Sequence, residues 1–214
     1  GAVSVATNEP VLKDLTIENA TIYAGDETDD GTLQYGAGVL VGSITLLGGS
    51  SAKYAAIENC HVSGQVDSKM YAGGLIGAAS YGKISNCSAD TIVTGNTVSG
   101  GFTGYAFSSS FENNTAKGSV TSTGWSTGGF AGWVYEGAIT KCTASGNVKA
   151  DNWNLGGFAG YLSGATVNAC TAYGDVTGTA TTFIAKAGGF VGTNKGSMIQ
   201  RSEERRVGKE CRSR

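Results

Sequence analysis

Residues 128–132 read Gly-Gly-Phe-Ala-Gly, and residues 156–160 repeat the same five letters 28 positions later. Related copies are Gly-Val-Leu-Val-Gly at 38–42, Gly-Gly-Leu-Ile-Gly at 73–77, Gly-Gly-Phe-Thr-Gly at 100–104 and Gly-Gly-Phe-Val-Gly at 188–192. Successive copies begin 35, 27, 28, 28 and 32 residues apart. A recurring period of about 28 residues predicts a repeat protein in which the longer intervals contain loop insertions.

A second signature follows each copy of the first, and consists of an apolar residue, two variable residues and usually a cysteine. Its copies are Ile57-Glu58-Asn59-Cys60, Ile84-Ser85-Asn86-Cys87, Phe111-Glu112-Asn113-Asn114, Ile139-Thr140-Lys141-Cys142 and Val167-Asn168-Ala169-Cys170. We interpret residues 17–20, Ile-Glu-Asn-Ala, as a degenerate earlier copy, and residues 199–200 as the start of another.

Small or apolar residues alternate with polar residues after the cysteine. Cys142, Ala144, Gly146 and Val148 fall on one side of an extended chain, and the residues between them are polar. A period of two is typical of a strand with one buried face. The alternation changes phase between the apolar residue of the second signature and its cysteine, which predicts a corner or bulge at that point.

Glycine in the first signature, as at Gly132 and Gly160, is expected on the inner side, where it lets the walls approach closely. No single repeat can bury its own apolar face, so the repeats must stack. The sequence therefore predicts an all-β fold: a parallel β-helix (β-solenoid), right-handed, with about 28 residues per coil and five to six coils. An array of antiparallel hairpins is the rival fold.

Composition agrees with short strands and tight turns. The 214 residues include 35 glycines, one proline and only 15% charged side chains. No stretch of roughly 20 apolar residues is present, so we expect no membrane insertion of this part of the protein.

The last fourteen residues, 201–214, differ from everything before them and match the translation of a common sequencing adapter at every position. We expect them to be a non-native, disordered tail, and residues 1–200 to be one solenoid domain truncated at both ends. The tail carries six of the 15 basic and three of the 17 acidic side chains, which leaves about −5 for the rest. That balance argues against nucleic acid as a partner.

The two signatures together, Gly-Gly-Phe/Leu-x-Gly followed by Ile-x-Asn-Cys and a Gly-x-Val strand, resemble the GLUG motif repeat over roughly residues 17–200. Repeats of this family occur in large bacterial surface and secreted proteins, including adhesin-like proteins and the non-catalytic regions of immunoglobulin-A-cleaving zinc proteases. The resemblance implies a bacterial extracellular or cell-surface protein. It implies no catalytic residue and no cofactor, because the motif has none.

Residues suited to catalysis or metal binding are sparse. His61 is the one histidine and falls on the polar side of a strand, where a solvent-facing role is expected. Without a second histidine there is no His-Glu-x-x-His site and no Ser-His-Asp set. The acidic run at residues 26–31 lacks the glutamate that an EF-hand calcium loop requires and is interpreted as a solvated loop. We therefore predict neither an enzyme nor a metal site.

Four cysteines recur once per coil. Cys60 should neighbour Cys87, and Cys142 should neighbour Cys170, at a separation that a disulfide tolerates. Because Asn114 replaces cysteine in one copy, a buried ladder of unpaired thiols is favoured over disulfides.

Aromatic residues supply the candidate binding site. Tyr105, Trp133 and Tyr161 hold one repeat position on three successive coils, and by alternation they point outward. Trp125 and Trp153 form a second column, three residues before the Gly-Gly pair. Such a stripe suits a host glycan or an extracellular protein. The alternative is that the rings form a ladder that only stabilises neighbouring strands.

The expected function is a non-catalytic structural or adhesive repeat region of a large bacterial surface or secreted protein, with further domains flanking it. Two alternatives stay open. One is the accessory solenoid of a secreted enzyme, such as an immunoglobulin-A-cleaving metalloprotease whose catalytic domain lies elsewhere. The other is a β-helix enzyme that acts on polysaccharides, which would need a cluster of carboxylates along one groove.

Overall fold

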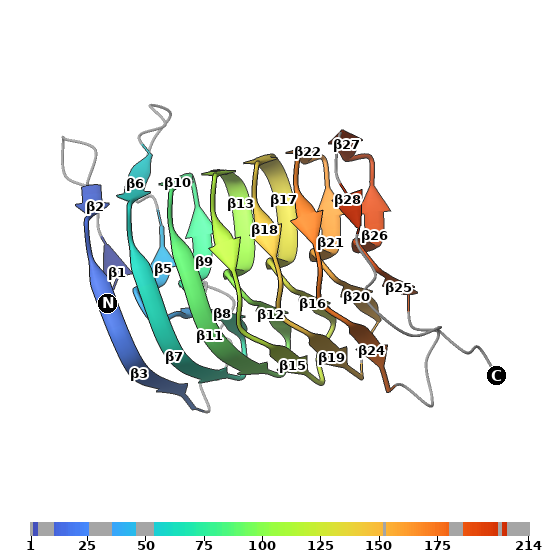
Figure 1. Cartoon of the computed structure of the whole chain (residues 1–214), viewed down its shortest axis with the longest axis horizontal. Coiled ribbons are helices and arrows are strands. Elements are labelled where there is room, and N and C mark those ends of the chain that lie inside the picture. The colour runs from blue at the N-terminus through green and yellow to red at the C-terminus, as the bar shows by residue number, and fades with distance from the viewer. Residues whose placement is uncertain are drawn as a thin grey trace.

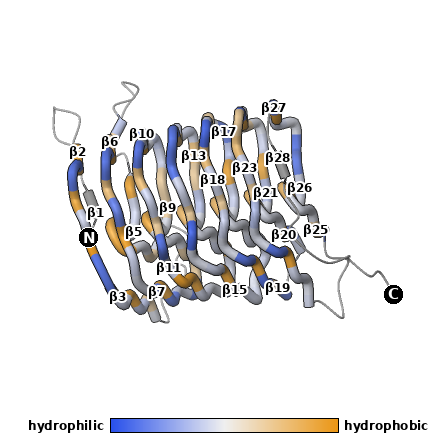
Figure 2. The backbone as a smooth tube through the Cα atoms, viewed as in Figure 1, coloured by the Kyte–Doolittle hydropathy of each residue, from blue (hydrophilic) through white to orange (hydrophobic). Residues whose placement is uncertain are grey.

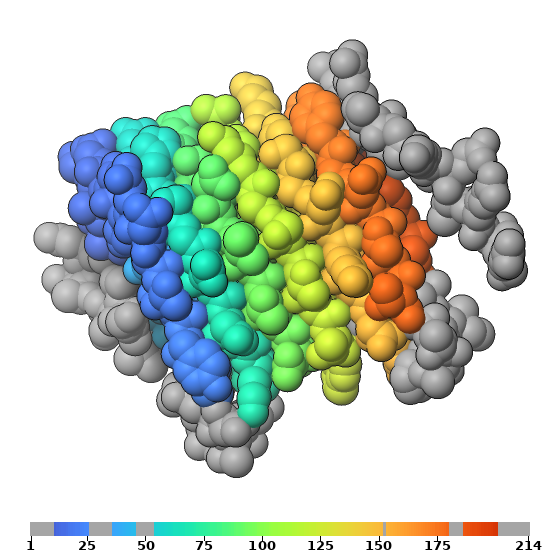
Figure 3. Space-filling model, turned by 60° about the horizontal axis from the view of Figure 1, so that its bottom comes forward, coloured from blue at the N-terminus to red at the C-terminus, as the bar shows by residue number. Residues whose placement is uncertain are grey.

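Stacked coils of β-strand make up the whole described part of the chain (Figure 1). The computed structural model describes residues 2–3, 11–25, 36–45, 54–151, 153–179, 186–200 and 203–204. Within these ranges there is no helix, and every strand pairing is parallel. The predicted β-solenoid is therefore confirmed and the antiparallel array is excluded, whereas its right-handed sense stays a prediction. In the space-filling view the coils lie side by side in sequence order (Figure 3).

Three parallel sheets form the walls. The strands of sheet A are β1 (Ala2–Val3), β2 (Val11–Lys13), β5 (Val41–Ile44), β6 (Ala55–Glu58), β9 (Ile76–Ser80), β10 (Gly82–Ser85), β13 (Thr103–Glu112), β17 (Ala131–Thr140), β21 (Ala159–Ser163), β22 (Thr166–Asn168), β26 (Val191–Lys195) and β27 (Met198–Gln200). The long strands of sheet A each pair with two shorter strands on a neighbouring coil: β13 with β9 and β10, and β17 with β21 and β22.

The other two sheets complete each coil. Sheet B contains β3 (Thr16–Ala24), β7 (His61–Ser68), β11 (Ser88–Gly95), β14 (Thr115–Ala116), β15 (Val120–Ser122), β18 (Thr143–Ala144), β19 (Val148–Ala150), β23 (Thr171–Ala172), β24 (Val176–Gly178) and β28 (Glu203–Glu204). Sheet C contains β4 (Gly36–Ala37), β8 (Tyr71–Gly73), β12 (Val98–Gly100), β16 (Ser126–Gly128), β20 (Asn154–Gly156) and β25 (Lys186–Gly188). The chain passes through C, A and B in turn, and Ser126 pairs with Asn154, one period of 28 residues later.

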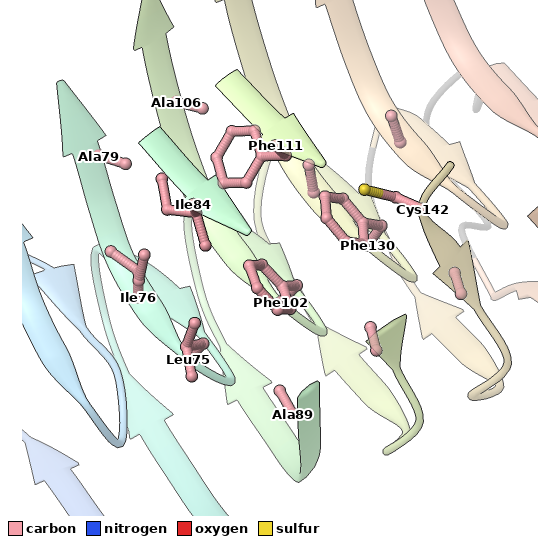
Figure 4. Packing of buried hydrophobic residues seen from close by; sticks show 14 of the residues in the cluster. Leu75, Ile76, Ala79, Ile84, Ala89, Phe102, Ala106, Phe111, Phe130 and Cys142 are labelled. Carbon is pink, nitrogen blue, oxygen red and sulfur yellow. The ribbon is translucent and has the colours of Figure 1, made fainter. Parts of the chain in front are cut away.

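A ladder of phenylalanines forms the centre of the core, at the corner where sheet C turns into sheet A. The Phe102 and Phe130 rings stack 4.8 Å apart at 7°, and Phe130 and Phe158 stack 5.0 Å apart at 1°. Phe190 continues the column at 4.8 Å from Phe158. Figure 4 shows Phe102 and Phe130 with the ring of Phe111, which meets Phe130 edge-on at 5.8 Å. Side chains at equivalent positions of successive repeats thus pack against one another.

The alternation predicted for sheet B is confirmed. Cys142, Ala144 and Val148 are buried, while Ser145 and Asn147 between them are exposed. Apolar and polar positions recur in this way from coil to coil (Figure 2). Glycine at the inner position of sheet A is also explained: a Cβ on Gly132 would lie 2.7 Å from the Gly104 carbonyl oxygen and 2.8 Å from the Ser99 backbone nitrogen. The walls approach closely there, as predicted.

The corner predicted inside the second signature is a single residue in the left-handed conformation. Asn59, Asn86 and Asn113 have φ of 53°, 54° and 56°. Asparagine tolerates this region better than other non-glycine residues do. Its amide also bonds along the column, since Asn113 Nδ2 donates to Asn86 Oδ1 at 2.7 Å. This conformation explains why asparagine stands directly before the cysteine position in three of the five signature copies, with Asn114 in place of cysteine in one of them.

Lys141 and Ala169 occupy the same corner with φ of 54° and 53°, although neither residue favours it. Replacing Ala169 with asparagine is therefore expected to stabilise the protein by about 0.5–1 kcal/mol, because a left-handed conformation costs other L-residues roughly 1–2 kcal/mol. Thermal unfolding checks this. The reciprocal change, Asn86→Ala, should lower the midpoint. A midpoint that falls with Ala169→Asn would contradict the prediction.

One predicted repeat copy is wrong. Leu12 pairs with Ile57, and Thr16 pairs with His61, so the first copy of the second signature is Leu12-Lys13-Asp14-Leu15 and not residues 17–20. Asp14 has the corner conformation, with φ of 56°, and its Oδ1 accepts a hydrogen bond from Asn59 Nδ2 at 3.1 Å. Residues 17–20 lie in β3, where the register shifts at a bulge.

Two predictions concern the edges of the described ranges. The acidic run at residues 26–31 lies outside the described residues. Within the C-terminal tail, Glu203–Glu204 forms β28 and pairs with β23, where Glu204 takes the register position opposite Ala172. These two residues add a further strand to sheet B. The foreign origin and disorder of the tail, and the extent of the single domain, stay predictions.

Candidate binding surface

The first predicted aromatic column lies on sheet A. Tyr105 of β13 pairs in register with Trp133 of β17, which pairs with Tyr161 of β21. All three side chains are half-buried. Tyr71 of sheet C joins them, with its ring 5.2 Å from that of Tyr105. The structure therefore brings the predicted column together and adds a fourth member.

The rings of this column contact one another and do not form a flat platform. Tyr105 meets Trp133 at 6.1 Å and 77°, and Trp133 meets Tyr161 at 5.0 Å and 59°. Trp133 Nε1 is buried and has no hydrogen-bond partner among the described residues. Each ring packs against the ring of the next coil, which removes much of its surface from solvent. The arrangement is that of an aromatic ladder between strands.

A further aromatic column was missed by sequence reasoning. Phe107 and Tyr135 stack 5.6 Å apart at 15°, and Tyr81 meets Phe107 edge-on at 5.3 Å. The signal was present, since Phe107 and Tyr135 each follow a member of the first column by two residues. Residues two apart on a strand share a face. Tyr135 is 40% exposed at the outer limit of this face.

The second predicted pair, Trp125 and Trp153, is in a different environment. Each lies at the corner between sheets B and C, directly before β16 or β20. Trp125 is 68% exposed and Trp153 is 58% exposed. The backbone beneath them is held coil to coil, because Asn154 N–H donates to the Trp125 carbonyl at 3.2 Å and Trp125 N–H donates to the Thr97 carbonyl at 2.7 Å. These are the most solvent-accessible of the five predicted site residues.

The cysteine column is buried and reduced. Cys60, Cys87, Cys142 and Cys170 are all free and buried, which confirms the predicted ladder of unpaired thiols. Two of the sulfur atoms accept a hydrogen bond from the backbone of the preceding coil: Cys60 N–H donates to Cys87 Sγ at 3.3 Å, and Cys142 N–H donates to Cys170 Sγ at 3.4 Å.

Asn114 hydrogen-bonds to the preceding coil in the signature copy that has no cysteine. Its Oδ1 accepts a hydrogen bond from Cys87 N–H at 2.8 Å, and its Nδ2 donates to the Ile84 carbonyl at 2.9 Å. The side chain is fully buried. The column therefore requires a small side chain that can both accept and donate a hydrogen bond, and cysteine and asparagine meet that requirement.

Burial makes the Cys87 and Cys142 thiols unreactive. Desolvation raises the pKa of the Cys87 thiol from 9.0 to about 12, and burial raises the pKa of Cys142 well above its usual value. In a Cys211→Ser background, the folded protein is expected to resist a water-soluble thiol reagent at about pH 8, whereas the urea-unfolded protein should react at all four thiols. Equal rates for folded and unfolded protein would contradict this.

The same shift predicts the pH dependence of stability. As pH rises past 9.0 the Cys87 thiol ionises in the unfolded chain, while in the folded protein it stays protonated until about 12. The contribution of the neutral buried thiol is therefore present below pH 9 and is lost between about pH 9 and 12. Urea unfolding across this range should show a smaller loss of stability in Cys87→Asn than in the parent chain.

Groups able to perform chemistry are few in the described ranges. His61 is exposed, as predicted, and its Nδ1 lies 2.9 Å from Ser88 Oγ. Among the described residues no three His, Cys, Asp or Glu side chains gather in a way that could hold a metal ion. No helix suited to crossing a bilayer occurs in the described part of the chain.

The continuous parallel coils, the one-per-coil ladders and the outward aromatic columns define a β-solenoid repeat protein. Two of its repeats match the family described as "The GLUG motif", at residues 69–94 and 123–149. Each match begins at the corner before a sheet C strand and covers the first signature, so the chain is a GLUG-motif repeat protein. No curated protein matches the chain.

Proposed function

We propose that this solenoid is a non-catalytic structural and adhesive repeat region of a large bacterial protein that is secreted or displayed at the cell surface. The observation that carries the proposal is the contrast between the two aromatic sets. The rings of the Tyr105 column pack against one another and are half-buried, whereas Trp125 and Trp153 are 68% and 58% exposed. Largely exposed tryptophan rings offer apolar surface that suits contact with a partner.

The structural part of the proposal rests on how the coils add. Each coil pairs in register with the next on all three sheets. Every further coil therefore extends the stack by roughly 4.8 Å, the spacing of paired strands. Such a stack holds a surface feature at a set distance from its ends, which is the property that a stalk or display surface needs.

An array of glycans and extracellular-matrix proteins, probed with the labelled full-length chain, tests the adhesive part. We expect binding to at least one class of probe, with urea-unfolded protein as the negative control. Binding should survive an increase in salt, because aromatic contacts are not screened. Binding to no glycan and no protein would contradict adhesion and leave a passive spacer.

A further inference from the structure

We infer that Trp125 and Trp153 form a binding site for a neutral polysaccharide, whose chain runs along the solenoid axis over the corner between sheets B and C. This inference rests on the adhesive function proposed above and names its ligand class and its site. The corner lies apart from the Tyr105 ladder, because it precedes the strands of sheet C.

The two indoles belong to successive coils. The register of β16 with β20 places Trp125 and Trp153 one coil apart, which is a backbone separation of roughly 4.8 Å. The same corner column holds Thr97 before Trp125 and Met70 before Thr97. The two exposed indoles therefore form a short apolar strip parallel to the axis, followed on the preceding coils by the half-buried Thr97 and Met70, and a chain of sugar rings could lie along it.

The turn beneath the strip is held firmly. A Cβ on Gly124 would overlap the Asn96 carbonyl oxygen, so this turn lies directly against the preceding coil. Asn154 Nδ2 donates to the Trp125 carbonyl at 3.1 Å, and Asn154 Oδ1 accepts from Thr193 Oγ1 at 2.6 Å. A fixed backbone lowers the entropy lost when a ligand binds the side chains that it carries.

The size of the strip favours a thin ligand over a protein. An aromatic side chain contributes about 150–250 Å² when fully buried, so these two partly exposed rings offer less than about 500 Å². A standard protein interface needs about 800 Å² on each partner. Exposed Asn96, Thr123 and Asp151 border the strip with hydrogen-bonding groups. An apolar strip with polar edges matches a sugar chain, which has apolar C–H faces and hydroxyl edges.

The charges near the corner favour a neutral chain. Among the described residues near the corner, the exposed charged side chains include both acidic and basic groups: Asp67, Lys69, Lys149, Asp151 and Lys186. Two negative and three positive groups nearly cancel, so they do not select for a strongly anionic or cationic polymer. A neutral polysaccharide is repelled by neither sign of charge at this site.

Affinity electrophoresis of the full chain tests the inference. Gels would contain a soluble β-glucan, a galactomannan or, as the anionic comparison, polygalacturonate. We expect at least one neutral polysaccharide to retard the chain, with each single variant, Trp125→Ala or Trp153→Ala, weakening binding about tenfold. The double alanine variant should migrate as it does in a polymer-free gel, and the double phenylalanine variant should recover part of the retardation.

Tyr173→Ala is the matched control, because Tyr173 is 44% exposed and lies directly after β23, away from this corner. It should keep full retardation, and circular dichroism should show every variant folded. Retardation that persists in the double alanine variant, or that occurs with polygalacturonate alone, would overturn the inference. Array binding to proteins alone would overturn it too, while leaving the adhesive function standing; an array with no binding at all removes both.

Discussion

Replacing Phe130 with alanine is expected to destabilise the solenoid by about 3–5 kcal/mol, the usual cost of deleting a buried phenylalanine ring. The ring is fully buried and stacks on Phe102 and Phe158, at 4.8 and 5.0 Å. It also meets the edge of Phe111 at 5.8 Å. Removing it opens a cavity in the middle of the ladder, which the rigid coil spacing prevents from collapsing. Urea unfolding followed by circular dichroism measures the loss.

Phe130→Leu is the control for size. Leu75 already occupies this column two coils earlier and is fully buried, so the site accepts a branched aliphatic side chain. A change that nearly conserves volume should cost less than about 1.5 kcal/mol. If the alanine and leucine variants unfold at the same urea concentration, the ladder is not the main source of cohesion between coils.

Asn114→Leu is expected to cost about 2–6 kcal/mol, even though it places an apolar side chain of similar size in the core. The change leaves Cys87 N–H and the Ile84 carbonyl without the partners that Asn114 supplies at 2.8 and 2.9 Å. Each buried backbone group left unsatisfied costs about 1–3 kcal/mol. Thermal and urea unfolding would both report the loss.

Asn114→Cys separates hydrogen bonding from packing. Cysteine stands at this position on both neighbouring coils, where Cys87 and Cys142 are buried. A thiol can still accept from Cys87 N–H, so this variant should lose less than about 1.5 kcal/mol, within the range of a single weakened hydrogen bond. An Asn114→Leu protein as stable as Asn114→Cys would show that the column needs only volume.

Much of the fold could be predicted from residues that repeat. The interval between the Gly-Gly-Phe copies sets the coil length, and alternation through Cys142 and Val148 identifies the inner face of sheet B. Both follow from local geometry, because side chains on a strand alternate sides and equivalent positions stack. The asparagine before the cysteine was a recognisable corner signal for the same reason, since its conformation depends on a single residue.

Other features depend on contacts between coils. Residues 17–20 match the second signature in letters, yet the pairing of Leu12 with Ile57 assigns that role to residues 12–15. The letters could not settle the register, because a β-bulge lies in β3 and only pairing with the next coil reveals it. The two hydrogen bonds of the Asn114 side chain could not be predicted from the sequence either, since both of its partners belong to the preceding coil.

Residue spacing and alternation alone are enough to predict a stack of coils with about 28 residues each, and which side of each strand faces inward. Which aromatic residues face solvent depends instead on how neighbouring coils pack. Alternation directs Tyr105 outward, but its ring packs against Trp133, while Trp125 of the second column stays 68% exposed. Alternation reports the direction in which a side chain leaves its own strand. Exposure depends on the neighbouring coil, which covers the flat wall of sheet A and leaves the corner before sheet C open.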